Sequence, residues 1–309
     1  MGPTPLSGIG QVMMKYVKLF EGEYVTFGQM PKKEYKHVFA FVLPLKEQVM
    51  YVKNVFNPDV VMTVCETRPV HEDYKLIFDT FKCVVTPSEF CKKIFDKQFG
   101  TNLPVFEHHV EKCEISKPID TNPYIFYTIG NVLDQRKNIP KLIEAFIKCN
   151  FKNAKLVIKA TCIRDVHWKV PNVEVINGLL SDEDIDKIHK RCHCYINFSK
   201  SEGVGMGAVE AAVRNKPVII TDYGGLKEYV KTPFIVHCEE TFIGNEDFLF
   251  QPHMKWGEPS IEDLIKHMKM CYTNKITHWD HKHTREKTSG SMLRAKLANL
   301  SSTLARGSV

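Results

Sequence analysis

The sequence predicts an α/β protein of two domains, each built on a mainly parallel sheet with helices on both faces. Strand-like and helix-like runs alternate along both halves of the chain, which is the pattern of parallel sheets. A polar segment with two prolines, residues 112–123, separates the halves. The 309 residues suffice for two domains of ordinary size, each with its own core.

The composition is that of a globular protein, with 43% hydrophobic and 25% charged residues. No apolar run approaches the roughly twenty residues of a transmembrane helix. The first ten residues lack the basic start and apolar stretch of a signal peptide. We therefore expect a cytoplasmic protein, with any membrane contact being peripheral.

The ten cysteines lie mostly inside apolar runs, which favours buried free thiols in a reducing compartment. The closest cluster is Cys192, His193 and Cys194. On a strand the two cysteines share one face and His193 points away, so we expect no zinc site here.

The first half begins with Gly8 and Gly10, a glycine-rich turn ahead of a helix whose apolar spacing starts at Val12. Strands are predicted at 23–28, 38–43, 60–65 and 84–85. Helices are predicted at 46–56, 71–81 and 88–99, followed by an extended segment at 104–110. Ligands of parallel sheets bind at the carboxyl ends of the strands. Glu66 follows a strand at that edge, where it is either an acid of the cleft or a cap of the next helix.

The second half repeats the alternation of strands and helices. Strands are predicted at 124–129, 155–159, 173–176, 217–221 and 234–237. Helices are predicted from 139, from the N-cap Ser181, and over 261–272. Residues 239–258 read as a polar connection.

Residues 198–230 are the stretch around which the chain is organised. Glu202 and Glu210 stand eight positions apart around a glycine-rich loop, and a strand then leads to Gly224 and Gly225. Glycines let a ligand approach the backbone, and the first N–H groups of a helix suit a phosphate. A carboxylate repels phosphate, so each glutamate is expected to accept hydrogen bonds from hydroxyl groups. The pattern predicts a nucleotide sugar as the ligand.

Arg136 and Lys137 precede the helix predicted from 139. The positive end of a helix dipole disfavours cations, so a bound anion explains this pair better. An exposed basic pair at a helix start is the alternative.

The run SEGVGMGAVEAAVRNKPVIITDYGGLKE resembles the donor-site signature of the retaining glycosyltransferases of family 4, the glycosyl transferases group 1. That family has the GT-B fold, two Rossmann-like domains with parallel sheets facing a central cleft. The resemblance extends from about Tyr124 to Tyr272 and is loose in the first half. It implies transfer of a sugar, with retention of configuration, from a UDP- or GDP-sugar to a glycan, lipid or protein acceptor. It implies no metal and no other cofactor.

The resemblance also implies roles for single residues. Arg136 and Lys137 would neutralise the donor diphosphate, Glu202 would hold the sugar, and Glu66 stands near the position of a family histidine. These four form the implied catalytic set. Asn131 stands where the family usually has an arginine, and Ala160 where it more often has glycine. The implied donor-binding residues are Gly8, Gly10, Asn131, Gly178, Leu180, Gly203, Val204, Gly205, Met206, Gly207 and Glu210, the last binding the ribose hydroxyls.

Three segments are expected. Residues 1–117 form the acceptor-side domain, which either lacks its first strand or begins differently. Residues 118–262 form the donor-binding domain, and residues 263–309 contain helices that cross back to the first domain and a basic tail. Residues 271–309 carry seven Lys or Arg against two acids, which either contact an anionic surface or form a solvated helix face. No nucleic acid is expected, because aromatic residues are not interleaved with the charges.

Three other functions fit the same pattern. The chain could bind nucleotide sugars without transferring them, or it could be a nucleotide-sugar epimerase or a phosphorylase of the same fold. An epimerase changes the sugar without an acceptor, and a phosphorylase requires inorganic phosphate.

Overall fold

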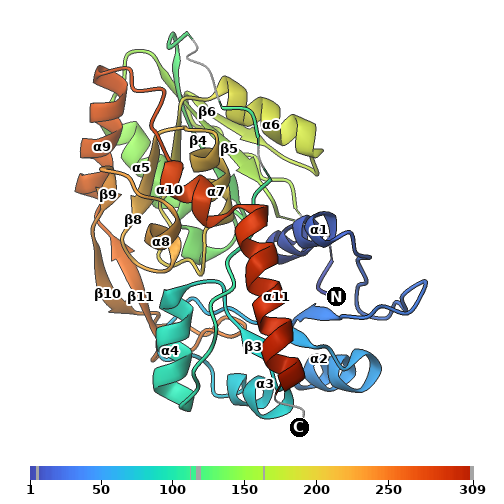
Figure 1. Ribbon diagram of the computed structural model, residues 1–309. Helices are drawn as coiled ribbons and strands as arrows, with labels where there is room; N and C mark the ends of the chain where they lie inside the picture. Colours follow the sequence, from blue (N-terminus) through green and yellow to red (C-terminus); the bar gives the residue numbers. More distant parts are fainter. Residues whose placement is uncertain (5–6, 112, 116–119, 163, 307–309) are drawn as a thin grey trace. The chain divides into compact units, whose positions relative to one another are not determined.

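The computed structural model describes residues 1–4, 7–111, 113–115, 120–162 and 164–306 (Figure 1). The chain forms two compact units. The first comprises Met1–Glu111, Phe242–Lys255 and Glu286–Val309, and the second comprises Lys112–Thr241 and Trp256–Arg285. The predicted boundary between residues 117 and 118 lies outside the described residues, as does part of the predicted linker.

The first unit contains a parallel sheet of order β1-β2-β3, with helices that follow its strands. Its strands are β1 (Phe39–Phe41), β2 (Val60–Met62) and β3 (Val84–Val85). Its helices are α1 (Gly8–Phe20), α2 (Lys46–Tyr51) with the π-helical turn η1 (Val52–Phe56), α3 (Tyr74–Thr80), α4 (Glu89–Phe99) and α11 (Gly290–Arg306). A parallel bridge between Thr86 and Val105 continues the pairing beyond β3, so the predicted extended segment at 104–110 lies beside the sheet.

The start of the chain differs from the prediction. No strand forms over residues 23–28; Thr26 makes one bridge to Gly2, and a turn closes between Thr26 and Gln29. The Gln29 side chain accepts hydrogen bonds from the Thr26 N–H and hydroxyl groups, which stabilises this turn. Met1 instead pairs with β1, because its carbonyl accepts a 2.9 Å hydrogen bond from the Phe41 N–H.

The predicted glycine-rich turn is the first turn of a helix. Helix α1 begins at Gly8, and its N-cap Ser7 accepts a 3.0 Å hydrogen bond from the Gly10 N–H. A serine at this position satisfies one of the N–H groups that a helix start leaves unpaired. Both glycines therefore belong to the helix.

The second unit contains a six-stranded sheet of order β6-β5-β4-β7-β8-β9 in which all strands are parallel. The strands are β4 (Tyr124–Gly130), β5 (Ala154–Ala160), β6 (Val173–Ile176), β7 (Cys194–Asn197), β8 (Val218–Thr221) and β9 (Ile235–Val236). The helices are η2 (Gln135–Lys137), α5 (Ile139–Cys149), α6 (Asp182–Arg191), α7 (Met206–Val213), α8 (Leu226–Tyr229) and α9 (Ile261–Thr273), and α10 (Lys282–Lys287) begins in this unit and ends in the first. The order reverses direction between β4 and β7, and such switch points bind ligands in open α/β sheets.

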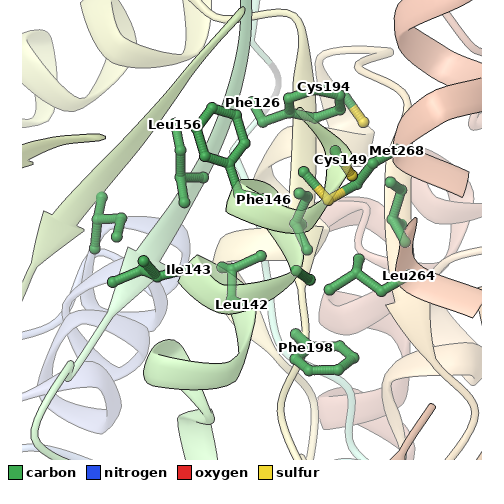
Figure 2. Packing of buried hydrophobic residues seen from close by; sticks show 14 of the residues in the cluster. Phe126, Leu142, Ile143, Phe146, Cys149, Leu156, Cys194, Phe198, Leu264 and Met268 are labelled. Atoms are coloured by element: carbon green, nitrogen blue, oxygen red, sulfur yellow. The ribbon is translucent and has the colours of Figure 1, made fainter. Parts of the chain in front are cut away.

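One face of this sheet packs against α5 and α9 (Figure 2). Phe126, Leu156 and Cys194 project from three strands into the core, and Leu142 of α5 and Leu264 of α9 meet them there. Each fully buried leucine side chain contributes roughly 1.5–3 kcal/mol. This core fixes the strands, and therefore the positions of the loops at their carboxyl ends.

The predicted polar connection at 239–258 is wrong, because it contains a pair of strands, β10 (Cys238–Phe242) and β11 (Lys255–Pro259). Glu239 and Glu240 are exposed on β10, whereas Trp256 and Gly257 are buried on β11. Acidic residues are poor strand formers, and residues 238–242 do not alternate between apolar and polar side chains. No strand was therefore predicted here.

The basic C-terminal segment is bonded within the first unit. Lys287 and Lys296 pair with the buried Glu107 at 3.3 and 2.5 Å. Arg294 donates two hydrogen bonds to the Leu19 carbonyl. Arg294 and Lys296 hold α11 in place and Lys287 holds the end of α10, which neither of the two readings of the tail anticipated.

The cysteines are free thiols, and most are buried, as predicted. The part of the chain that the structure describes contains no group of three or more His, Cys, Asp and Glu side chains able to hold a metal ion. Within the same part, no helix has both the length and the apolar character that crossing a membrane requires.

Candidate functional site

The candidate site lies at the carboxyl ends of β4 and β7, at the switch point of the larger sheet. Two loops meet there, one at 131–138 after β4 and one at 198–205 after β7. A hollow opens at these loops, and its lining includes Gly130, Lys137, Asn197, Ser199, Glu202 and Gly207.

Glu202 is the centre of this site and is only 4% exposed. Its Oε1 accepts hydrogen bonds from the Lys137 ammonium at 2.6 Å and from the Ser199 hydroxyl at 2.8 Å. The Asn197 amide donates to the same oxygen at 3.2 Å. The Glu202 Oε2 accepts from the Arg136 guanidinium at 3.2 Å. The carboxylate is therefore enclosed by donors from both loops.

Arg136 is buried and has a second acidic partner. Its guanidinium lies 3.0 Å from the Asp134 carboxylate and donates a 2.7 Å hydrogen bond to the Ser201 carbonyl. The other Asp134 oxygen accepts from the Arg136 N–H at 2.9 Å and caps η2. Arg136 thus joins the two loops that form the site.

The electrostatics of the cluster keep Glu202 ionised. Burial raises the pKa of its carboxyl, but Lys137 and Arg136 lower it more, and the resulting pKa is about 2 against an ordinary 4.5. Two cations face two carboxylates, Asp134 and Glu202. These internal pairs account for cations ahead of α5, so the dipole argument for a bound anion does not hold by itself.

The glycines of the turn after β8 serve close packing against the site. Gly224 has φ +104°, and a side chain there would meet the Glu202 backbone oxygen at 2.4 Å. The Gly225 N–H donates a 2.8 Å hydrogen bond to that same oxygen. The turn after β8 therefore holds the backbone of Glu202 in place, and only glycine fits at this approach.

Gly207 lies in the first turn of α7. A Cβ atom there would be 2.2 Å from the Tyr195 hydroxyl, which itself bonds both the N–H and the carbonyl of Ile129. Gly205, in the left-handed conformation, is the N-cap of α7, and Gly203 and Val204 precede it in the loop. The start of α7 is thus held against β4 and β7, with Met206 as its first residue.

Other predicted donor-binding residues lie on the same sheet edge. Asn131 follows β4, and its side chain accepts a hydrogen bond from the Leu133 N–H at 3.1 Å. Gly178 follows β6 with φ +79°, and Leu180 lies two residues on. Glu210 is half-buried on α7, and its carbonyl accepts from Arg214.

Gly8, Gly10 and Glu66 belong to the first unit. Glu66 is half-buried after β2. The next helix, α3, starts only at Tyr74 with Asp73 as its N-cap, so Glu66 does not cap it.

Sequence reasoning missed several members of the cluster. Asn197 and Ser199 are polar residues at the end of the apolar strand β7, and Asp134 stands two residues before Arg136. Outside the cluster, Lys159 was missed as well; it is a buried lysine near the end of β5. Polar residues where a buried strand ends were the available signal, because strand ends form the ligand edge of such sheets.

Comparison with known proteins gives a consistent result. Residues 111–240 match the family model described as glycosyl transferases group 1. Over 155 residues the chain is 29% identical to an uncharacterized glycosyltransferase of Methanocaldococcus jannaschii, covering 48% of this chain and 42% of the relative. The chain thus spans less than half the length of that curated relative.

Solved structures share the fold at low sequence identity. Sucrose-phosphate synthase of Thermosynechococcus elongatus aligns with TM-score 0.62 and 14% identity over 97% of this chain and 80% of its own. A TarM variant of S. aureus, in complex with fondaparinux, alpha-GlcNAc-glycerol and UDP, aligns with TM-score 0.61 and 16% identity. That match covers 85% of this chain and 55% of TarM.

Proposed function

Because residues 111–240 belong to the glycosyl transferases group 1 family and the chain has the GT-B fold, we propose that it transfers a sugar from a nucleoside diphosphate donor to an acceptor with retention of configuration. The cluster of Arg136, Lys137 and Glu202 at the switch point supports this function above all. It combines two buried or half-buried cations with a carboxylate in one hollow.

The difficult step of such a transfer is the departure of the nucleoside diphosphate while the sugar becomes cationic. Arg136 and Lys137 would stabilise the charge that develops on the leaving diphosphate, and preorganised donors of this kind give the largest single contribution to many enzymes. The N–H groups at the start of α7 would also stabilise this negative charge, because the N-terminus of a helix favours anions.

Glu202 would hold hydroxyl groups of the donor sugar, and Glu210 those of the ribose. In the structure, Glu202 is bonded to Lys137, so donor binding would exchange this ion pair for contacts to diphosphate and sugar. Both carboxylates accept and neither donates in its ionised form, which suits sugar hydroxyls.

The donor would be a UDP- or GDP-sugar. The similarity to a TarM structure that contains UDP favours the uridine nucleotide. Two protein cations beside the diphosphate position would make a divalent metal unnecessary. The ten free thiols favour a cytoplasmic location, since cytoplasmic proteins keep their cysteines reduced.

The acceptor would be a glycan, lipid or protein. Gly8 and Gly10, which we propose as donor-binding residues, and Glu66, which we propose as a catalytic residue, lie in the first unit. The tail cations that pair with Glu107 leave fewer charges for contact with an anionic surface, which favours a structural role for α11.

The function is tested by incubating the protein with UDP- and GDP-sugars and a set of acceptors in the presence of EDTA. Acceptor-dependent release of the nucleoside diphosphate, with the same anomeric configuration in product and donor, is the expected result. Sugar conversion without an acceptor would instead identify an epimerase, and binding without any turnover would identify a binding protein.

A further inference from the structure

Lys159, the sixth of the seven residues of β5, is a buried lysine that the proposed chemistry does not use. It is only 3% exposed. Its ammonium donates a 2.8 Å hydrogen bond to the Gly178 carbonyl and a second, short one to the Ala160 carbonyl. It thereby links the carboxyl ends of β5 and β6.

Among the described residues, the charge of Lys159 has no anionic partner. In the described parts of the chain, no carboxylate lies within 4.0 Å of its ammonium, in contrast to Lys137. Burial of a cation without a counterion is costly. Burial accordingly lowers the pKa of Lys159, with only Cys162 acting in the other direction. An apolar residue would fill the position at a lower cost in folding free energy. We therefore infer that the ammonium binds a ligand.

The side chain lies away from the main core. Leu156, Ile158 and Ala160 of β5 belong to the core cluster that α5 and α9 cover. Lys159 alternates with them and therefore projects from the opposite face. Its neighbours across the sheet are Ile129 on β4 and Ile176 on β6.

The position of Lys159 fits one part of the donor. The diphosphate cations lie at the β4–β7 switch point, and the backbone of Glu202 is fixed by the turn after β8. In the proposed function the sugar contacts Glu202, beside the turn after β8, so the nucleoside would extend along the strand ends toward β5 and β6. Lys159 and the loop at Gly178 lie there, at the carboxyl ends of β5 and β6. This step rests on the proposed function.

We propose that Lys159 determines the specificity for the base of the donor by donating a hydrogen bond to O4 of uracil or O6 of guanine. A lysine ammonium has three donors and no acceptor. It can meet the oxygen of uracil or guanine, whereas it opposes the amino group that cytosine or adenine carries at the corresponding position. The site therefore selects bases that carry an oxygen, and not an amino group, at that position.

The test compares the binding of two ligand pairs, UDP with CDP and GDP with ADP, by calorimetry without metal. Wild-type protein should bind UDP more tightly than CDP, or GDP more tightly than ADP, by about ten- to a hundredfold, as expected for a hydrogen bond to a charged group. Lys159→Met should reduce this ratio to about threefold or less. Lys155→Met, at an exposed lysine on the same strand, should keep the wild-type ratio.

Lys159→Gln provides a second variant if Lys159→Met does not fold. Its amide still bonds the Gly178 and Ala160 carbonyls, but it can also accept from an amino group, so the preference should be lost as well. An unchanged ratio in a folded Lys159 variant, or equal binding of both members by wild type, would overturn the proposal. Absence of all nucleotide binding by wild type would instead refute the proposed function.

Discussion

The Lys137 ammonium lies 2.6 Å from Oε1 of Glu202, although the two residues are 65 positions apart in the sequence. One comes from the loop after β4 and the other from the loop after β7. In the proposed function, the first binds diphosphate and the second binds sugar. The two groups neutralise each other before the donor arrives, so donor binding has to compete with an internal ion pair.

Replacing Glu202 by Gln should separate affinity from turnover. The amide no longer competes for Lys137 and Arg136, so UDP should bind at least as tightly as to wild type. Turnover should fall, because the contact to the sugar loses its charge-assisted hydrogen bond. Calorimetry with UDP and initial rates with the full donor measure the two effects. Parallel loss of UDP affinity and turnover would show that Glu202 supports the diphosphate itself.

Stability should depend on the ionisation of Glu202. Its pKa is about 2 in the folded protein and near 4.5 ordinarily, so the unfolded chain takes up the proton first as the pH falls. The stabilisation is complete above about pH 5 and is lost between there and about pH 2. Its size is about 3 kcal/mol. Urea unfolding of wild type and Glu202→Gln across this range should give curves that converge at low pH, and a constant gap would refute the assignment.

Gly207→Ala should destabilise the protein through one contact. The added Cβ would lie 2.2 Å from the Tyr195 hydroxyl, and such overpacking costs about 1–3 kcal/mol. Tyr195→Phe removes the hydroxyl and its bonds to Ile129, at a cost of about 1 kcal/mol. The double variant should lose less stability than the sum of the two single variants, since Tyr195→Phe removes the hydroxyl that the added Cβ would contact. Additive losses in thermal unfolding would contradict this packing.

Glu258→Gln should weaken the positioning of the loop after β7. Glu258 pairs with Lys141 and, at 2.9 Å, with Lys200, whose N–H bonds the Arg136 carbonyl at 2.8 Å. These charges are partly exposed, so the loss of stability should stay below about 1 kcal/mol. Turnover should fall by more than the small loss of folded protein accounts for. Glu144→Gln, which breaks an exposed pair with Lys148 on α5, is the control and should leave turnover unchanged.

Local patterns predicted much of the second unit. The strand at 173–176 and the cap Ser181 occur as expected, because apolar runs and capping residues act over a few positions. The start of the first unit and the β10–β11 pair were missed. In both places polar residues, such as Gln29 and Glu240, act through turns and exposed strand faces that lack apolar alternation.

The sequence pattern singles out candidate residues but does not predict the contacts between them. The glycines and glutamates of 202–210 carry a recognisable pattern, whereas the pairing of Glu202 with Lys137 depends on how β4 and β7 come together. No local signal joins residues so far apart. Lys159 was overlooked for the same reason, since its burial follows from its neighbours β4 and β6.

Titration of wild-type protein with UDP and GDP in the presence of EDTA, compared with Lys137→Met, tests the central claim most directly. Lys148→Met, at an exposed lysine on α5, serves as the matched control. One nucleotide should bind to wild type and to the control with equal affinity, and about tenfold or more weakly to Lys137→Met. Failure of both nucleotides to bind at millimolar concentration, or equal binding by Lys137→Met, would contradict a diphosphate site at the β4–β7 switch point.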